Sequence, residues 1–534
     1  IFRTGCEYEY KRVVLMLGRI KEILWGTPTA VIILLVGAYF TFALLRRGAF
    51  GKKSVVAAFR SYGSGGSDGI SPFSSLATAL GGTVGIGSIT GVGIALSVGG
   101  AGSMLWFWLC GLLCGGIKYA EVVSASCSRI RMNGVFVGGA MYSLKTDGHK
   151  TAAVIFSVCG ILASFGTGNM TQASAVGDVM AANGIHVRFF DALRPTPELS
   201  FAVLHYGTAA GLNITASHNP KEYNGYKVYW SDGAQLPPHK AEAIAKQMEA
   251  IDIFTGFKTC DFDEAVAEGK IEIIGQETDE LFLENVMTQA IDKEVVKEVA
   301  DDLRIVYTPF HGCGYKLVPE ALRRLGIKHL YPVEQQMVID GRFPTVESPN
   351  PENPEGFYLA VDLAKRVNSN LIIGTDPDSD RIGTMVRGAD GEYSVITGNQ
   401  LGCLLLDYVI NARRATGTMP ENPGAMASIV STSMARTICE KNGVHFEDTF
   451  TGFKFMAELV NHWDAAGTYH YIFAFEESYG YMMGNYVRDK DAVTASMIVA
   501  EMAAHYHKLG MTLLDALKAL YEKYGYYKEK TLNL

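Results

Sequence analysis

The chain has 534 residues, enough for about three to four domains. Its formal net charge of −8 hides two unlike parts: residues 1–175 carry 15 Lys and Arg against six Asp and Glu, whereas the remainder carries 32 against 49. The acidic part excludes nucleic acid as an expected partner, because a phosphate backbone requires clustered basic residues. Nine scattered cysteines show no paired framework and no zinc-type Cys/His cluster, which suits a reducing, cytoplasmic environment for the acidic part.

The first predicted element is an uncharged apolar helix over residues 29–45. Trp25 precedes it, and a basic cluster follows it at Arg46, Arg47, Lys52 and Lys53. Bilayer interfaces favour such flanking residues, and a span requires about 20 residues. We therefore expect a membrane-spanning helix; the alternative is a buried core helix.

Residues 70–116 carry no charge and are rich in Gly, Ser and Thr. Small residues let membrane helices approach closely, and a Gly-dense run predicts a broken helix whose carbonyls can face a cation. Lys118 and Glu121 are spaced to pair on one helix face. A third apolar run covers residues 151–168.

Three stretches in this first part resemble the alanine/glycine:cation symporter family: ISPFSSLATALGGTVGIGSITGV, KYAEVV and ILASFGTGNMTQA. The resemblance implies an all-α transmembrane fragment over residues 1–175, with a membrane as its partner and location. Ser88 stands where that family has Asn, and the family's second repeat is missing. Because sites in such folds lie between repeats, we do not expect a complete transport site.

Beyond residue 176 the pattern changes to α/β. Charged amphipathic stretches predict helices at 236–252 and 285–302, and apolar runs predict strands at 303–307, 370–373, 427–431 and 471–475. Two of these strands lead directly into Asp376 and Glu476. Ligand sites in such sheets form at the carboxyl ends of strands, so these residues mark a candidate site.

Ser217 lies in a run of turn-forming and polar residues, Thr-Ala-Ser-His-Asn-Pro-Lys-Glu-Tyr-Asn-Gly-Tyr-Lys, over residues 215–227. A serine hydroxyl placed in a shaped loop can carry a phosphoryl group between two positions of a substrate. His218 and Lys227 are close enough in sequence to stabilise phosphate charge or to move protons. The alternative is an ordinary Asx-type turn.

Three carboxylates at alternate positions, Asp376, Asp378 and Asp380, can hold a hard cation. A calcium-binding EF-hand would need Gly and Glu where this chain has Arg381 and Arg387, so magnesium is the preferred ion. A metal facing a phosphoserine would neutralise charge on the transferred group. The alternative is a solvated acidic turn.

Further candidates occur downstream. Glu476, Glu477 and Ser478 follow a predicted strand. The two adjacent carboxylates, Glu476 and Glu477, can accept hydrogen bonds from sugar hydroxyls, or they form a solvated pair at a strand end. The group Arg488–Asp491 is either a charged surface face or supplies Lys490 for acid/base or phosphate contact. Thr451, Gly452 and Lys454 can meet a phosphate or form a strand-to-helix turn. His311 is expected to serve a turn.

Together these motifs resemble the α-D-phosphohexomutase family, and within it the bacterial phosphoglucomutases. TASHNPKEYNGYK is similar to the phosphoserine loop, GTDPDSDRIG to the magnesium loop and FEESYGY to the sugar loop; LRPTPELSFAV, FPTVESPNPE and VRDKDAV also match. The resemblance implies mixed α/β domains: a domain I remnant at 176–300, domain II at 301–420 and domain III at 421–534. The implied metal ligands are Ser217, Asp376, Asp378 and Asp380; the catalytic set is Ser217, His218, Lys227 and Lys490; the substrate-binding set is Arg381, Thr451, Gly452, Glu476 and Ser478.

The implied reaction interconverts glucose 1-phosphate and glucose 6-phosphate through the phosphoserine and a 1,6-bisphosphate. It implies Mg²⁺ as cofactor, glucose 1,6-bisphosphate as activator and a phosphorylated hexose as partner. Family segments expected before Ser217 and after the last residue are not found, so we expect impaired activity. The alternatives are a phosphomannomutase, a sodium:amino-acid symporter fragment and a non-functional fused reading frame.

Overall fold

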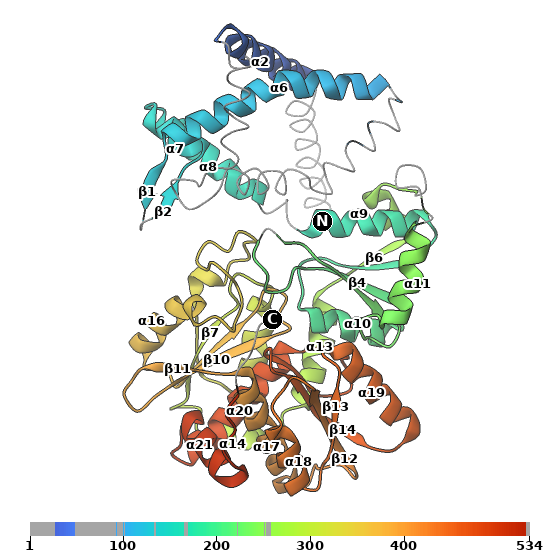
Figure 1. Cartoon of the computed structure of the whole chain (residues 1–534), viewed down its shortest axis with the longest axis vertical. Helices are drawn as coiled ribbons and strands as arrows, with labels where there is room; N and C mark the ends of the chain where they lie inside the picture. The colour runs from blue at the N-terminus through green and yellow to red at the C-terminus, as the bar shows by residue number, and fades with distance from the viewer. Residues whose placement is uncertain are drawn as a thin grey trace, which may run out of the picture. The chain divides into compact units, whose positions relative to one another are not determined.

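The computed structural model describes residues 27–47, 102–132, 135–164, 169–221, 223–249 and 258–529, together with residues 92, 95, 100 and 251. The chain divides into two units, Ile1–Gly168 and Asn169–Leu534 (Figure 1).

The first unit contains the two described helices that are long and apolar enough to cross a membrane, α2 (Thr27–Arg46) and α6 (Gly102–Cys127). Only 6% of the apolar window of each is buried, which contradicts the buried-core alternative for residues 29–45. The helices pack where side chains are small: a Cβ on Gly116 would lie 2.5 Å from Thr41 Oγ1, and Thr41 Oγ1 donates a hydrogen bond to the Leu113 carbonyl at 3.0 Å. Such close backbone approach is typical of membrane helix pairs.

The other described elements of this unit are a short hairpin of β1 (Ile130–Met132) and β2 (Val135–Val137), followed by α7 (Ala140–Thr146) and α8 (Lys150–Ser164). Helix α8 covers most of the predicted third apolar run. The Lys118–Glu121 ion pair forms at 3.1 Å on α6, as predicted. Most of the Gly-rich run lies outside the described residues, so the broken helix stays a prediction.

The second unit begins with α9 (Asn169–Ala182) and two small sheets. One pairs β3 (Val187–Phe190) in parallel with β6 (Ile271–Ile274); the other is an antiparallel hairpin of β4 (Ala210–Ile214) and β5 (Tyr226–Trp230). The helices of this region are α10 (Thr196–Tyr206), α11 (Pro238–Glu249) and α12 (Phe262–Ala267), and α11 confirms the predicted helix at 236–252.

A five-stranded sheet follows, in the order β11-β10-β9-β7-β8. Strands β7 (Arg304–Thr308), β8 (His329–Pro332) and β9 (Leu371–Thr375) run parallel. Strand β10 (Ile382–Arg387) pairs antiparallel with β9, and β11 (Tyr393–Ile396) pairs antiparallel with β10. The central strands are buried on both faces, as expected of parallel strands covered by helices. The associated helices are α15 (Gly314–Leu325) and α16 (Tyr358–Val367), with short 3-10 turns at Glu334–Gln336 and Pro354–Phe357.

The last sheet has the order β13-β12-β14-β15. It consists of β12 (Pro423–Ser428), β13 (His445–Thr449), β14 (His470–Glu476) and β15 (Gly480–Met482). Helices α17 (Gly398–Ala415), α18 (Met434–Lys441) and α19 (Phe453–Ala466) pack with it (Figure 1).

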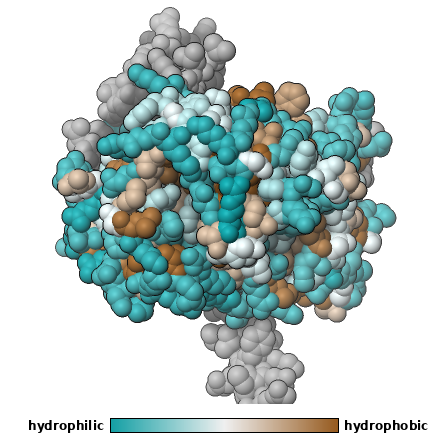
Figure 2. Space-filling model, turned by 90° about the horizontal axis from the view of Figure 1, so that it is seen from below, coloured by the Kyte–Doolittle hydropathy of each residue, from teal (hydrophilic) through white to brown (hydrophobic). Residues whose placement is uncertain are grey.

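Helix α20 (Ala492–Lys508) joins these layers, because it packs against α14 (Lys293–Glu298), α15 and α17. Its residues 492–504 are all buried. Helices α13 (Gln276–Thr288) and α21 (Leu513–Tyr524) are the remaining described helices of the unit. The face in Figure 2 is largely hydrophilic, with apolar residues in small separate patches.

The predicted strands at 303–307, 370–373 and 471–475 are confirmed as β7, β9 and β14. The strand predicted at 427–431 is shifted: β12 ends at Ser428, and Ile429 and Val430 are exposed beyond it. The helix predicted at 285–302 is broken into the end of α13 and the short α14, with Asp292 capping α14 through the Val295 amide.

Candidate active site

Ser217 lies in the loop that joins β4 to β5. The Thr215 amide donates a hydrogen bond to the Gly225 carbonyl at 3.1 Å, which closes the loop, and the Ser217 amide donates to Thr215 Oγ1 at 2.9 Å. Ser217 has φ of 54°, a backbone conformation that is uncommon for a residue with a side chain. Such strain is held only where surrounding contacts enforce it, and it frequently marks a functional position.

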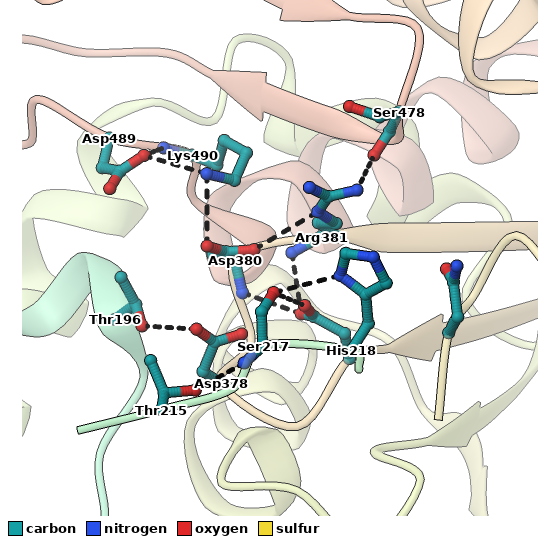
Figure 3. A network of polar contacts seen from close by, with 12 residues as sticks. Thr196, Thr215, Ser217, His218, Asp378, Asp380, Arg381, Ser478, Asp489 and Lys490 are labelled. Atoms are coloured by element: carbon teal, nitrogen blue, oxygen red, sulfur yellow. Dashed lines mark hydrogen bonds and ion pairs between the residues drawn. The ribbon is translucent and has the colours of Figure 1, made fainter. Parts of the chain in front are cut away.

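The three aspartates lie in the loop between β9 and β10. Asp376 follows the last residue of β9, and its Oδ1 accepts hydrogen bonds from the amides of Asp380 and Arg381 at 3.0 and 2.9 Å. These bonds curl the loop so that Asp376, Asp378 and Asp380 offer oxygens within 4.8 Å of one another. Ser217 Oγ donates to Asp376 Oδ2 at 3.2 Å, so the two loops meet (Figure 3).

Asp378 and Asp380 share one pattern: one oxygen is held by hydrogen bonds or lysine ammonium groups, and the other accepts no hydrogen bond from the described residues, although Asp380 Oδ1 lies 3.8 Å from Arg381 Nε. Asp378 Oδ2 accepts from Thr196 Oγ1 at 3.1 Å and from Lys227 Nζ at 2.9 Å. Asp380 Oδ2 accepts from Lys227 Nζ at 3.0 Å and lies 3.2 Å from Lys490 Nζ. Oδ1 of each is buried without a hydrogen-bond partner among the described residues. Buried oxygens are rarely left unsatisfied, and free carboxylate oxygens suit Mg²⁺, so the site fits that ion.

Lys227 and Lys490 supply the ammonium groups of the site. Burial alone would lower their pKa values, but Asp378 and Asp380 outweigh it at Lys227 and raise its pKa well above the ordinary value. At Lys490, Asp380 and Asp489 likewise raise the pKa against the effect of burial. Both side chains are therefore ammonium ions at neutral pH.

The pKa shifts of His218 and Asp376, in contrast, favour the neutral forms of both side chains. Burial, assisted by Arg381, lowers the pKa of His218 to about 4, and its Nδ1 lies 3.1 Å from Ser217 Oγ. Burial, then Asp378 and Asp380, raise the pKa of Asp376 well above its usual value. A bound divalent cation would favour the ionised Asp376 instead.

Arg381 connects the aspartate loop to the predicted sugar loop after β14. Its Nη1 donates to the Ser478 carbonyl at 3.1 Å, and it forms an isolated β-bridge with Gly480. Glu476 is buried, and its Oε1 accepts from the Gly452 amide at 2.5 Å. Thr451 is exposed in the turn from β13 to α19, so the strand-to-helix alternative describes this segment.

The structure corrects three alternatives. The surface-face interpretation of Arg488–Asp491 is wrong, because all four residues are buried; the order of the chain places them just before the core helix α20. The aspartate loop is not a solvated turn, and Glu476 is not part of a solvated pair, because the three aspartates and Glu476 are buried. They lie at the ends of β9 and β14, which are interior strands of their sheets. His311 is confirmed in a turn, with φ of 66° and both ring nitrogens within hydrogen-bond distance of turn atoms.

The sequence analysis did not identify the residues that hold the candidate site residues in place by hydrogen bonds. Tyr229 Oη and Gln235 Nε2 donate to Asp489 at 2.5 and 2.7 Å, which holds the carboxylate beside Lys490. Thr196 donates to Asp378, and Asn213 donates to Thr196. The LRPTPELSFAV motif was a signal for Thr196, whereas the other three gave no sign in the sequence.

Comparison with known proteins agrees with this geometry. Residues 167–253, 280–390 and 397–524 match the α/β/α domains I, II and III of the phosphoglucomutase/phosphomannomutase family. Residues 11–193 match the sodium:alanine symporter family, which together with α2 and α6 supports a membrane location for the first part.

Curated relatives include phosphoglucomutases from Staphylococcus haemolyticus, 33% identical over 68% of this chain and 64% of that protein, and from Staphylococcus saprophyticus, 35% identical over 67% and 63%. The chain thus spans slightly less than two thirds of these relatives. The Paramecium phosphoglucomutase pp63/parafusin, in its open form, has a similar fold, with a TM-score of 0.51 and 19% identity over 67% of this chain and 66% of that one.

The fold is therefore that of an α/β protein with phosphohexomutase-type domains. Through residues 167–524, the chain belongs to the phosphoglucomutase/phosphomannomutase family.

Proposed function

We propose that this chain is a phosphoglucomutase-like phosphotransferase that interconverts glucose 1-phosphate and glucose 6-phosphate. Ser217 carries the phosphoryl group, Mg²⁺ is the cofactor, and glucose 1,6-bisphosphate is the activator. The mutase part would act in the cytoplasm, with the first part in the membrane. The relatives named phosphoglucomutase support this substrate, although the chain spans only part of their length.

One observation carries the proposal: Ser217 Oγ lies 3.2 Å from Asp376 Oδ2, at the edge of a buried triple-aspartate loop in which two carboxylate oxygens accept no hydrogen bond from the described residues. A purely structural serine turn would not need three buried carboxylates beside it, because burying charge is costly. A bound Mg²⁺ would neutralise the negative charge that develops during phosphoryl transfer.

The proposed reaction consists of two phosphoryl transfers, each accompanied by a proton transfer. In the forward half-reaction the bond from phosphorus to Ser217 Oγ breaks, and a bond forms to the free hydroxyl oxygen of the sugar phosphate. The hydroxyl proton must leave, and it can return to Ser217 Oγ. The bisphosphate then returns its other phosphoryl group to Ser217. His218, neutral and 3.1 Å from Ser217 Oγ, can accept a proton, while the ammonium of Lys227 can stabilise charge or donate one.

Substrate recognition falls to the loops beside this centre. Glu476 and Ser478 are proposed to bind sugar hydroxyls, and Arg381 links them to the aspartate loop. Thr451 and Gly452 are proposed to approach the substrate at the turn before α19, although the Gly452 amide is already bonded to Glu476.

The test is a coupled mutase assay on the purified full chain in detergent, with glucose 1-phosphate, Mg²⁺ and a trace of glucose 1,6-bisphosphate. We expect Ser217→Ala to reduce the rate to that without protein. Ser496→Ala is the matched control, because Ser496 is buried on α20 and its hydroxyl has no hydrogen-bond partner among the described residues. Equal rates for Ser217→Ala and the unmodified chain would refute the proposal.

A second measurement does not depend on turnover. Mass spectrometry after incubation with glucose 1,6-bisphosphate should find phosphate on Ser217, and none on that peptide in Ser217→Ala. Mannose 1-phosphate in a matching coupled assay tests the alternative substrate, and a faster rate with it would replace the glucose assignment.

A further inference from the structure

Thr196 lies between the two loops of the proposed centre without belonging to either. It is the first residue of α10 and is fully buried. Its amide donates to the Asp378 carbonyl at 2.8 Å, and its Oγ1 donates to Asp378 Oδ2 at 3.1 Å (Figure 3). One side chain and one amide therefore fix both the backbone and the carboxylate of the same aspartate.

A second contact sets the direction of the hydroxyl. Asn213 Nδ2 donates to Thr196 Oγ1 at 2.7 Å, so the Thr196 oxygen is already an acceptor and its proton is directed to Asp378. Asn213 lies opposite Lys227 in the β4–β5 hairpin, and Lys227 Nζ reaches the same Asp378 oxygen at 2.9 Å. Both strands of the hairpin that carries Ser217 thus act on one carboxylate oxygen, one directly and one through Thr196.

We propose that Thr196 is a positioning residue of the cation site, which aligns Asp378 and keeps the Ser217 hairpin in register with the aspartate loop. With Oδ2 held by two donors, the other oxygen of Asp378 stays buried and free of hydrogen bonds from the described residues, available to a divalent cation. Without the hydroxyl, Asp378 Oδ2 retains only Lys227, and Asn213 loses its acceptor. The carboxylate can then rotate, which weakens cation binding. The proposal rests on the function proposed above.

The test compares four variants of the purified full chain in detergent, one of which, Asp376→Asn, removes a proposed cation ligand. Thr196→Val removes the hydroxyl at nearly constant volume, and Thr196→Ser restores it. Thr278→Val is the matched control: Thr278 is also fully buried and shares a hydrogen bond of 2.8 Å with Tyr206 Oη, on α13 and away from the aspartate loop. The probe is Mn²⁺, whose free concentration is read by electron paramagnetic resonance, so no catalytic turnover is required.

We expect the Kd for Mn²⁺ to rise about tenfold in Thr196→Val, which is typical when a partner of a metal ligand is removed. Thr196→Ser and Thr278→Val should bind as the unmodified chain does, although Thr278→Val should lose thermal stability. Mutase activity of Thr196→Val should recover partly at high Mg²⁺.

Two different results would overturn the inference, and they can be told apart. If the unmodified chain binds Mn²⁺ and Asp376→Asn abolishes binding, but Thr196→Val binds unchanged, then the cation site stands and Thr196 has no part in it. If the unmodified chain does not bind Mn²⁺, the proposed cation site fails and the role of Thr196 fails with it.

Discussion

Asp380 and Asp376 lie in one loop, yet replacing each with Asn should affect stability very differently. Asp380 is fully buried, and its Oδ2 is shared by Lys227 at 3.0 Å and Lys490 at 3.2 Å. Breaking a buried ion pair by removing one partner costs about 3–5 kcal/mol. Lys227 keeps Asp378 and Lys490 keeps Asp489, so we expect Asp380→Asn to lose about 3 kcal/mol, at the lower end of that range.

Asp376, by contrast, contacts no ammonium or guanidinium side chain among the described ion pairs. Its partners are the Ser217 hydroxyl and two backbone amides, and burial already favours its neutral form. An Asn oxygen can accept the same amide hydrogen bonds, so Asp376→Asn should cost no more than about 1 kcal/mol, the net worth of one hydrogen bond. Both variants should lose mutase activity.

The assay is unfolding in urea followed by pulse proteolysis of the full chain in detergent, with Mg²⁺ removed by EDTA so that cation binding does not add stability. Midpoints are compared between variants. A midpoint for Asp376→Asn as low as that for Asp380→Asn would refute the reasoning that the two lysines, and not burial alone, require the Asp380 charge.

Two further predictions concern Gly480 and Glu198. A Cβ on Gly480 would lie 2.4 Å from Lys490 Cδ, so Gly480→Ala should displace Lys490, lower the mutase rate and reduce the free energy of unfolding by about 1–3 kcal/mol. Gly177→Ala is the control, because a Cβ there would have no neighbour nearer than 3.7 Å; thermal unfolding and the mutase rate are measured for both variants. Burial, then Asp279, raise the pKa of Glu198 well above 4.5, so the folded chain favours the protonated acid and loses stability as pH rises from 4.5 through the folded-state pKa. Glu198→Gln should remove this loss; thermal midpoints measured against pH should diverge above pH 4.5, and parallel curves would contradict the assignment.

The sequence was informative where function depends on residues close together in the chain. The run NLII followed by Asp376 predicted β9 and its acidic loop, because a buried strand and a polar end are both local patterns. The turn formers around Ser217 predicted its loop for the same reason. The shifted end of β12 shows the limit of this reasoning, since the apolar residues Ile429 and Val430 fall just outside the sheet and are exposed.

The supporting contacts could not be predicted, because they join residues that are far apart in sequence. Thr196 and Asp378 are 182 positions apart, and Tyr229 and Asp489 are 260 apart. The charge group Arg488–Asp491 shows why composition misleads here: four charged residues in succession usually face water, but each of these has a partner in the interior. Only the tertiary fold supplies those partners.

The hydrogen bonds at the start of α20 fix the position of Lys490 relative to the aspartate loop. Asp491 caps the helix by accepting from the amides of Val493 and Thr494, and its own amide donates to the Tyr481 carbonyl at 2.8 Å. The next amide, that of Ala492, donates to the Ser379 carbonyl inside the aspartate loop at 3.3 Å. Lys490 directly precedes this cap, so its ammonium is placed by the end of the most buried helix described. The same helix packs against α14, α15 and α17. Substitutions in its core face should therefore move Lys490 relative to Asp380, which makes the packing of α20 part of the geometry of the proposed site.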